Sequence, residues 1–452
     1  MNLILLLIFT VAHASLPAYH DWMLGNGVEI HESVDLHSYE EAKAASIKSF
    51  VKNGTVLASV SSDIILNMKS IGQSPTLANV LDSKELEGRV TNVIKLAVFL
   101  LYSKHSVESE SPWKSMIESF PNYGSSTSFW PQEDLVLLNG TTVYRRTVER
   151  LRGINSAYNL LLPHLTGTDV DGLIPTEQFT LPALLYCIQH IFSSSDSVKN
   201  ERGETVPVLI PFIESLPRMP NSCCRLQARN NEAGTTSELI LVATRDMQAG
   251  EELSVLSDHK TNYQMLLDHG TMDLQNKFNG IPFSFRFDVN DPHRVMKNQV
   301  LSMMGTSEFA EEIIMNTDNG APPASLLRKL RIQMLDFQNF DSYRKIITSN
   351  EPLSLGNELR VLRTLWGATG SMLGSFSNQS LDYEIDLLKT FETDDNTPHP
   401  MTRPEVSGHI RYEEKSILFK LRIWIQKKWL SMLEIPFDEM VQLEDFRTLQ
   451  TK

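Results

Sequence analysis

The stretch ELILVATRDMQAGEELSVLSDHKTNYQMLLDHGT (residues 238–271) decides the fold of this chain. Its first part alternates Leu239 and Leu241 within an apolar run, which predicts a half-buried strand. A polar turn, ATRDMQAGEE, follows it, and Val255 then marks a second strand. After that strand, Asn262 precedes a short apolar helix and is predicted to cap its N-terminus.

The strand pattern recurs near the N-terminus, in KNGTVLASV (residues 52–60). There the apolar residues alternate between polar or small ones after a glycine turn, as in a strand with one buried face. We therefore expect five apolar side chains from both stretches to be buried in a single β-core: Val56, Val60, Leu239, Leu241 and Val255.

Taken together, the ATRDMQAGEE turn, Asn262 and the Leu-Leu pair at 266–267 resemble the closing segment of a SET domain. The most similar variety is the plant Rubisco large-subunit lysine methyltransferase. A second signature of that family is matched by Phe-Trp at 129–130, Leu-Leu at 137–138 and Gly-Thr at 140–141. The resemblance implies an α+β protein, with a SET-type β-fold that carries a helical insertion and is followed by an all-helical C-terminal domain.

The same resemblance implies domain boundaries. Residues 20–275 would form the SET-like domain, with the helical insertion at about 85–205, and residues 276–435 would form the helical substrate-binding domain. Apolar residues at helical spacing predict that this second domain has its own apolar centre. We expect that centre to include Leu330, Leu362, Trp366 and Leu418.

Two further local predictions concern the insertion. The run IPTEQFTLPALLYCIQHIF (residues 174–192) is predicted to be a helix with Thr176 as its N-cap. The polar segment that follows it, at 193–205, is predicted to be a loop.

The family uses an Asp-x-x-Asn-His motif, a Ser-Arg pair, a Tyr-Gly and a Tyr-Gly-Phe to hold S-adenosylmethionine and the substrate lysine. Segments of this chain match those motifs in position, but other residues stand at the motif positions. The matching positions are occupied by His190, Glu214, Pro217, Arg218, Ser257 and His269. Of these, Ser257 stands in place of the catalytic tyrosine, and the others stand at cofactor-binding positions.

These replacements are unfavourable for cofactor binding and for methyl transfer. Pro217 has neither an N–H nor a polar side chain, whereas the family asparagine binds the cofactor. A cation at Arg218 would repel a sulfonium nearby, and Ser257 is too short to align an amine. Residues 39–50, where the family has a glycine-rich cofactor loop, contain no glycine. The residues therefore favour impaired or lost catalysis.

Two functions remain open from the sequence. One is a protein-lysine N-methyltransferase with a divergent site that uses S-adenosylmethionine. The other is a pseudoenzyme of the secretory route that binds proteins without catalysis. In either case the implied partner is a protein or peptide with an accessible lysine.

Composition excludes other classes. The net charge of −14, from 55 acidic and 41 basic residues, is unsuited to binding a phosphate backbone, so no nucleic-acid partner is expected. The acidic balance suits a basic partner, and it equally suits simple solubility. Three cysteines, at 187, 223 and 224, imply no disulfide framework, and we expect no metal site and buried or free thiols.

The N-terminal run MNLILLLIFTVAHA (residues 1–14) has the apolar core and small-x-small end of a signal peptide. It is too short to span a bilayer as a helix. The chain is thus predicted to enter the secretory route, or to be cytoplasmic if this run is not a signal.

Overall fold

The structure is a computed structural model, and it describes residues 16–36, 45–105, 113–120, 124–166, 172–199, 205–219, 222–230, 236–256, 260–284, 287–305, 313–316, 320–335, 351–391 and 401–433. The chain divides into two compact units. The first comprises Met1–Phe129, Thr147–Lys260 and Leu266–Gly270, and the second comprises Trp130–Arg146, Thr261–Met265 and Thr271–Lys452. The predicted signal peptide, half of the predicted cofactor loop (residues 39–44) and Ser257 lie outside the described residues.

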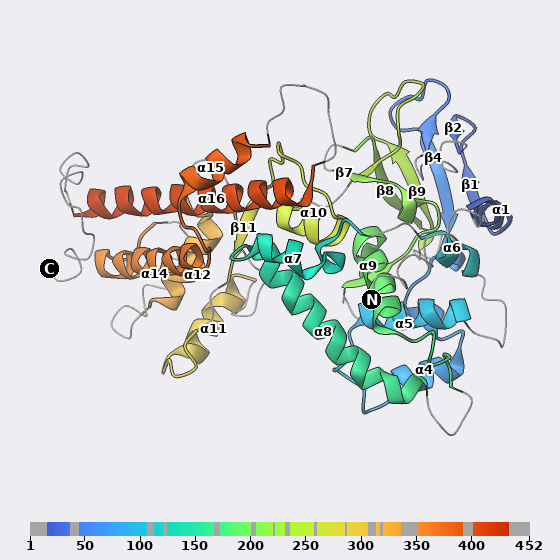
Figure 1. The fold of residues 1–452 in the computed structure, drawn as a ribbon, viewed down its shortest axis with the longest axis horizontal. Coiled ribbons are helices and arrows are strands. Elements are labelled where there is room, and N and C mark those ends of the chain that lie inside the picture. Colours follow the sequence, from blue (N-terminus) through green and yellow to red (C-terminus); the bar gives the residue numbers. More distant parts are fainter. Residues whose placement is uncertain are drawn as a thin grey trace. The chain divides into compact units, whose positions relative to one another are not determined.

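A six-stranded sheet forms the centre of the first unit, and β4, β8 and β9 lie side by side in it (Figure 1). Its strand order is β1 (Val28–Ile30), β4 (Val56–Ser61), β9 (Thr236–Ala243), β8 (Cys224–Asn230), β10 (Val255–Leu256) and β7 (Arg218–Met219). The first three pairings are antiparallel, whereas β10 runs parallel to both β8 and β7. Short two-stranded sheets pair β2 (Val34–Asp35) with β3 (Ser46–Ile47), and β5 (Asp196–Lys199) with β6 (Thr205–Val208).

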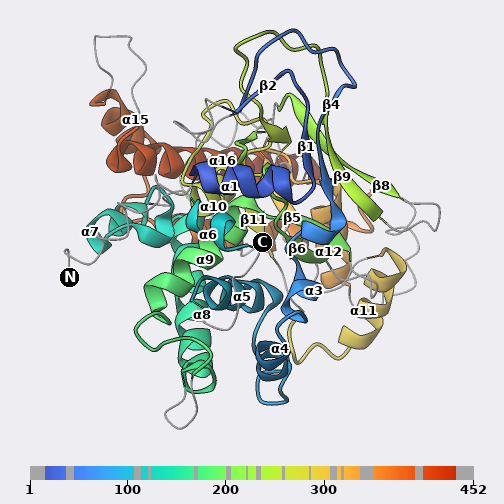
Figure 2. The same ribbon diagram turned by 90° about the vertical axis from the view of Figure 1, so that its right-hand side faces the viewer.

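The first unit also contains helices. They are α1 (Leu16–Gly25), α3 (Met68–Ile71), α4 (Pro75–Leu81), α5 (Asn92–His105), α6 (Lys114–Glu118) and α9 (Leu181–Ser194), with 3-10 turns at Ser62–Ile64, Thr127–Phe129 and Ile213–Ser215. Both views place α4 and α5 below β4, β8 and β9 (Figures 1 and 2). Helix α5 is buried on nearly every side, because its sequence NVIKLAVFLL is almost entirely apolar.

The predicted β-core is confirmed for four of its five residues. Val60, Leu239, Leu241 and Val255 are buried in one apolar cluster of the first unit. Val56 is only half-buried, because the register of β4 against β9 shifts between Val56 and Ala58. A bulge of this kind breaks the strict alternation that the sequence pattern assumes.

The second unit is mainly helical. It contains α7 (Gln132–Leu135), a 3-10 turn at Val136–Leu138, α11 (Arg294–Met303), α12 (Ala324–Gln333), α14 (Leu355–Gly374), α15 (Leu381–Lys389) and α16 (Arg403–Met432). The helices α8 (Thr142–Leu165) and α10 (Asn262–His269) begin in the second unit and end in the first. A two-stranded sheet, β11 (Gly280–Phe283) with β12 (Ile313–Asn316), accompanies the helices. A Cβ atom at Gly280 would collide with the backbone of β12, so the pairing requires glycine there.

The second unit has its own apolar centre, as predicted. Leu330, Leu362 and Leu418 are fully buried in one cluster, and Trp366 packs against it half-buried. These residues come from α12, α14 and α16, and the last two helices lie side by side in Figure 1. None of the described helices is both long enough and apolar enough to cross a membrane.

Three local predictions were wrong. Helix α9 is capped by Thr180, whose side chain accepts the Ala183 N–H, rather than by Thr176. Pro182 explains the difference, because proline is tolerated only in the first turn of a helix. The predicted loop at 193–205 contains β5 and the start of β6, which pair with each other. Asn262 is the first residue of α10, and its side chain binds elsewhere, to Glu413 and to the backbone of Asp273.

Candidate functional site

A cavity of about 330 Å³ lies in the first unit beside the strand β7. Its walls come from the end of α9, from β5 and β6, and from the segments that flank residues 257–259. The polar side chains that define it are Asp196, Arg218, Lys260, Asp268 and His269. Leu256, which is 47% exposed, supplies an apolar wall next to the position of Ser257.

Arg218 is held in the cavity wall by a two-point ion pair. Its Nη1 donates to Asp196 Oδ1 at 2.6 Å and its Nη2 donates to Asp196 Oδ2 at 2.8 Å. The Nη2 atom also donates to the Ser194 carbonyl at 2.8 Å, and the side chain is only 8% exposed. Paired hydrogen bonds of this geometry fix both position and orientation. The Arg218 guanidinium therefore has a fixed position in the cavity wall.

A second group of charges surrounds Asp268. Arg150 donates to it at 2.7 Å and Lys260 at 3.2 Å. Burial disfavours the ionised carboxyl, yet these two cations outweigh burial and hold the pKa of Asp268 below its usual range. The same Lys260 ammonium lies 3.1 Å from Nε2 of His269.

His269 is neutral at physiological pH. Burial, and then the charge of Lys260, lower the pKa of its imidazole to about 4. Asp268 opposes this shift only in part. A neutral imidazole nitrogen can accept a hydrogen bond from the lysine ammonium, which the 3.1 Å separation allows.

His190 and Glu214 are buried in the core of the first unit. Their side chains are fully or almost fully buried, and His190 Nε2 lies 3.5 Å from Glu214 Oε2. The Tyr19 hydroxyl donates to Glu214 Oε1 at 2.9 Å, and the ring of Phe120 stacks on His190. The structure thus separates the predicted site residues, because Arg218 and His269 share the cavity while His190 and Glu214 lie in the core.

A strained residue lies at this buried cluster. Phe212 has φ of +70°, a conformation rare for a residue with a side chain. Its N–H donates to the Tyr19 hydroxyl at 3.1 Å, and its side chain is completely buried. The strain is thus held by packing and by the same tyrosine that binds Glu214.

Pro217 takes part in the sheet. Its carbonyl accepts the N–H of Val255 at 2.9 Å, which ties the start of β7 to β10. Sequence reasoning identified Pro217 and Arg218 from their motif, but it missed the partners Asp196, Lys260, Asp268 and Arg150. Only the fold brings these charges together, since no local spacing links them.

The cavity residues do not suit S-adenosylmethionine. Its sulfonium requires an environment that favours a positive charge, but Asp196 and Asp268 are already engaged by cations of the protein. Arg218 and Lys260 add positive charge to the wall, and Pro217, which precedes Arg218 in the chain, has no side-chain amide. Among the described residues, no group of three or more potential ligands is placed to hold a metal ion.

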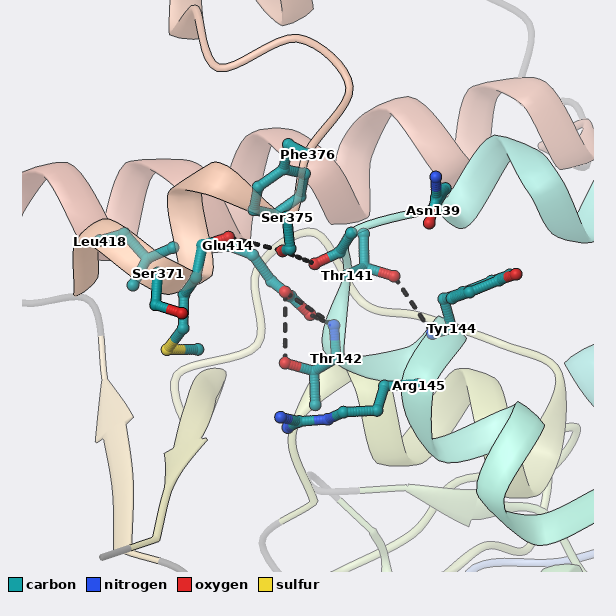
Figure 3. A pocket seen from close by; sticks show the side chains of 12 residues that line it. Asn139, Thr141, Thr142, Tyr144, Arg145, Ser371, Ser375, Phe376, Glu414 and Leu418 are labelled. Carbon is teal, nitrogen blue, oxygen red and sulfur yellow. Dashed lines mark hydrogen bonds between the residues drawn. The ribbon is translucent and has the colours of Figure 1, made fainter. Parts of the chain in front are cut away.

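A second cavity, of about 280 Å³, lies within the second unit (Figure 3). At its wall the buried Glu414 accepts the backbone N–H of Thr142, at 2.9 and 3.0 Å, and the Thr142 hydroxyl at 3.2 Å. Thr142 is the first residue of α8, so this carboxyl serves the N-terminus of a helix. Burial raises the pKa of Glu414 to about 8, although the bonds from Thr142 and the charge of Arg145 oppose the shift.

Two sequence comparisons match this chain to known proteins. A family model described as the Rubisco LSMT substrate-binding domain matches residues 288–418. The chloroplastic fructose-bisphosphate aldolase-lysine N-methyltransferase of Arabidopsis thaliana is 24% identical over 338 residues. That match covers 72% of this chain and 66% of the relative, so it spans just under two thirds of the relative's length.

Solved structures agree with the sequence matches. The SET domain of LSMT bound to lysine and AdoHcy superposes with a TM-score of 0.69 at 17% identity, over 96% of this chain and 95% of that one. Rubisco LSMT bound to AdoMet gives 0.68 at 16% identity, over 97% and 99%. The chain resembles the Rubisco large-subunit methyltransferases in sequence and in fold. The predicted resemblance and the α+β fold class are thereby confirmed, and the LSMT-like fold extends over almost the whole chain.

Proposed function

We propose that this LSMT-like protein has lost methyl transfer and binds a lysine-bearing segment of a partner protein. The observation that carries the proposal is the ion pair of Arg218 with Asp196. It fixes a guanidinium in the cavity wall at the position where the family motif has histidine. Its neighbour Pro217 lacks the amide of the family asparagine, and its carbonyl is committed to the sheet.

Electrostatics support the loss of cofactor binding. Nearby negative charge attracts a sulfonium, and an ion pair already formed within the protein weakens that attraction. The two described carboxylates of the cavity, Asp196 and Asp268, are each bound by one or two cations of the chain. A cationic ligand would have to displace one of those cations, and the displaced charge would then be left without its partner.

Restoring the motif tests this proposal. The triple variant Pro217→Asn, Arg218→His and Ser257→Tyr should gain a rise in melting temperature on addition of S-adenosylmethionine, because ligand binding stabilises the native state. The unmodified protein should show no rise. The matched control is Ser257→Tyr alone, which should not respond, because alignment of an amine is useless without a held cofactor. A response in the unmodified protein would contradict the proposal.

The partner class rests on the family resemblance and on the net charge of −14. Fluorescence anisotropy with labelled lysine-rich peptides tests it, and peptides of the same sequence with acetylated lysines are the control. We expect only the unmodified peptides to bind, because acetylation removes the positive charge of each lysine. Equal affinity for both peptide sets would refute a lysine-directed site.

A retained protein-lysine N-methyltransferase activity is the second candidate. It is supported by the similarity to the aldolase-lysine N-methyltransferase of Arabidopsis thaliana. Transfer of a labelled methyl group to any lysine peptide, lost in a Glu214→Ala variant, would favour this function over the first.

We also propose that residues 1–14 direct the chain into the secretory route, and that the domains divide at 20–275 and 276–435. Expression in a secreting eukaryotic cell, followed by N-terminal sequencing, tests the first point. A mature chain beginning at Ser15 in the medium supports it, whereas an intact Met1 in the cytosol refutes it.

A further inference from the structure

Two adjacent cysteines lie at the start of β8 in the first unit, one strand away from the cavity. Cys224 is the first residue of β8, Cys223 directly precedes it, and Cys224 is in register with Val255 of β10. Val255 in turn is in register with Arg218, which lines the cavity. The proposed loss of methyl transfer makes no use of these thiols.

The surroundings of Cys223 favour a thiolate. Its sulfur lies 3.3 Å from the Ser254 N–H donor, 3.5 Å from the Ser254 hydroxyl and 3.5 Å from the Cys224 sulfur. All three can donate to a negative sulfur, and the Arg245 guanidinium adds an attractive charge. Two carbonyls, those of Glu252 at 3.4 Å and Ser254 at 3.7 Å, act in the opposite sense.

These contacts shift the pKa values of the two thiols in opposite directions. The hydrogen bond from Cys224 is the largest influence on Cys223, and with those from Ser254 it lowers the pKa of Cys223 to about 6 against the effect of burial. The same hydrogen bond and burial raise the pKa of Cys224. Burial also raises the pKa of Cys187 to about 12, so that thiol is a natural internal control.

We propose that Cys223 is a nucleophilic thiolate that exchanges with low-molecular-weight disulfides, and that Cys224 resolves the product to a Cys223–Cys224 disulfide. The sulfurs are 3.5 Å apart, and a bond requires an approach to about 2 Å, which side-chain rotation and a small backbone shift supply.

The exchange balances without any further reagent. The Cys223 thiolate attacks one sulfur of a disulfide RSSR, so that the RS–SR bond breaks and one RS⁻ leaves. The Cys224 sulfur then attacks Cys223, the Cys223–SR bond breaks, and the leaving second RS⁻ takes up the Cys224 proton. The two protein thiols are oxidised by two electrons, and RSSR is reduced to two RSH after protonation.

Sequence adjacency makes this bond a reversible one. The Cα atoms of neighbouring residues in a trans peptide are about 3.8 Å apart, below the range of roughly 4.4–6.8 Å that disulfides prefer. Strained disulfides are reduced easily and serve as labile or regulatory bonds. Oxidation would also take the thiolate acceptor from Ser254, which directly precedes β10 and the cavity residue Leu256.

Exposed residues of the protein lie beside Cys223 on one side. Cys223 is 2% exposed, but its carbonyl accepts the N–H of Thr244, and both Thr244 and Arg245 are exposed. Because Cys223 is almost fully buried, entry of a small disulfide requires local opening of the chain around it.

The test is incubation of the native protein with oxidised glutathione, followed by intact-mass and peptide mass spectrometry. The unmodified protein should lose the mass of two hydrogen atoms, with the bond mapped to Cys223–Cys224. Cys224→Ser should stop at the mixed disulfide and gain one glutathionyl group on Cys223. Cys223→Ser should remain unchanged, as should Cys187 in every variant.

A second measurement follows the thiolate itself. The rate of alkylation of Cys223 by iodoacetamide should rise with a midpoint near pH 6. Ser254→Ala, which removes one donor, should move that midpoint upward, toward the value of about 8.5 for a free cysteine. Circular dichroism checks that this variant stays folded.

Four results would overturn the proposal. They are modification of Cys187 in place of Cys223, a stable mixed disulfide in the unmodified protein, an unreactive Cys223 at neutral pH, and an alkylation midpoint that does not respond to Ser254→Ala.

Discussion

Glu414 gives the sharpest prediction for stability, because its carboxyl is buried and its pKa is raised from an ordinary value of 4.5 to about 8. Between these two pH values the folded chain keeps a proton on Glu414 that the unfolded chain has lost. Folding then takes up a proton, so stability must fall as the pH rises. The contribution is fully present below about pH 4.5 and is lost as the pH approaches about 8.

The magnitude follows from the shift. One pKa unit corresponds to about 1.4 kcal/mol, so a rise from 4.5 to about 8 makes this contribution about 5 kcal/mol over the whole interval. The variant Glu414→Gln keeps an oxygen that accepts the Thr142 N–H but cannot ionise. It should therefore lose this pH dependence and be more stable than the unmodified protein at about pH 8.

Urea unfolding at several pH values from about 5 to about 8 measures the effect as the difference between the two proteins. The exposed Glu133→Gln is the matched control, since it removes a carboxylate of the second unit without a buried partner. Parallel pH profiles for the unmodified protein and Glu414→Gln would refute the reasoning, as would a stability that rises with pH only in the unmodified protein.

Four further outcomes are expected. Arg331→Met should lower the free energy of unfolding by about 3–5 kcal/mol, because it leaves the Glu358 carboxylate buried without the guanidinium that now binds it at 2.7 Å; urea unfolding measures this loss, and a small change would contradict it. Gly140→Ala should cost more than about 1 kcal/mol, because φ is +88° and the new Cβ would lie 2.7 Å from the backbone after α14. Gly153→Ala, in open space within α8, should instead stabilise by up to about 1 kcal/mol. The imidazole of His269 should show no titration by NMR above about pH 5, consistent with a pKa of about 4, and a midpoint near 6.5 would refute the effects of burial and of the Lys260 charge.

Much of the fold was predictable from local patterns. Leu239 and Leu241 follow the alternation of a strand, and the apolar run of α5 reads as a buried helix. The exceptions arise from the pairing of separate strands, which a local sequence pattern does not report. The bulge beside Val56 depends on the pairing of β4 with β9, and the polar β5 is a strand only because β6 pairs with it.

The candidate site was predictable only in part. Motif positions identified Arg218 and His269, which do line one cavity. Their charged partners Asp196 and Lys260 have no motif of their own, because an ion pair depends on distance in space rather than along the chain. Sequence reasoning also placed the core residue His190 with the cavity residues, since a family motif does not report burial.

We propose that the cavity beside Arg218 does not hold the methyl donor. Isothermal titration calorimetry of the purified protein with S-adenosylmethionine tests this most directly. We expect a dissociation constant above about 1 mM, equivalent to less than about 4 kcal/mol of binding free energy. A micromolar dissociation constant would contradict it and would show that other residues of the chain bind the cofactor.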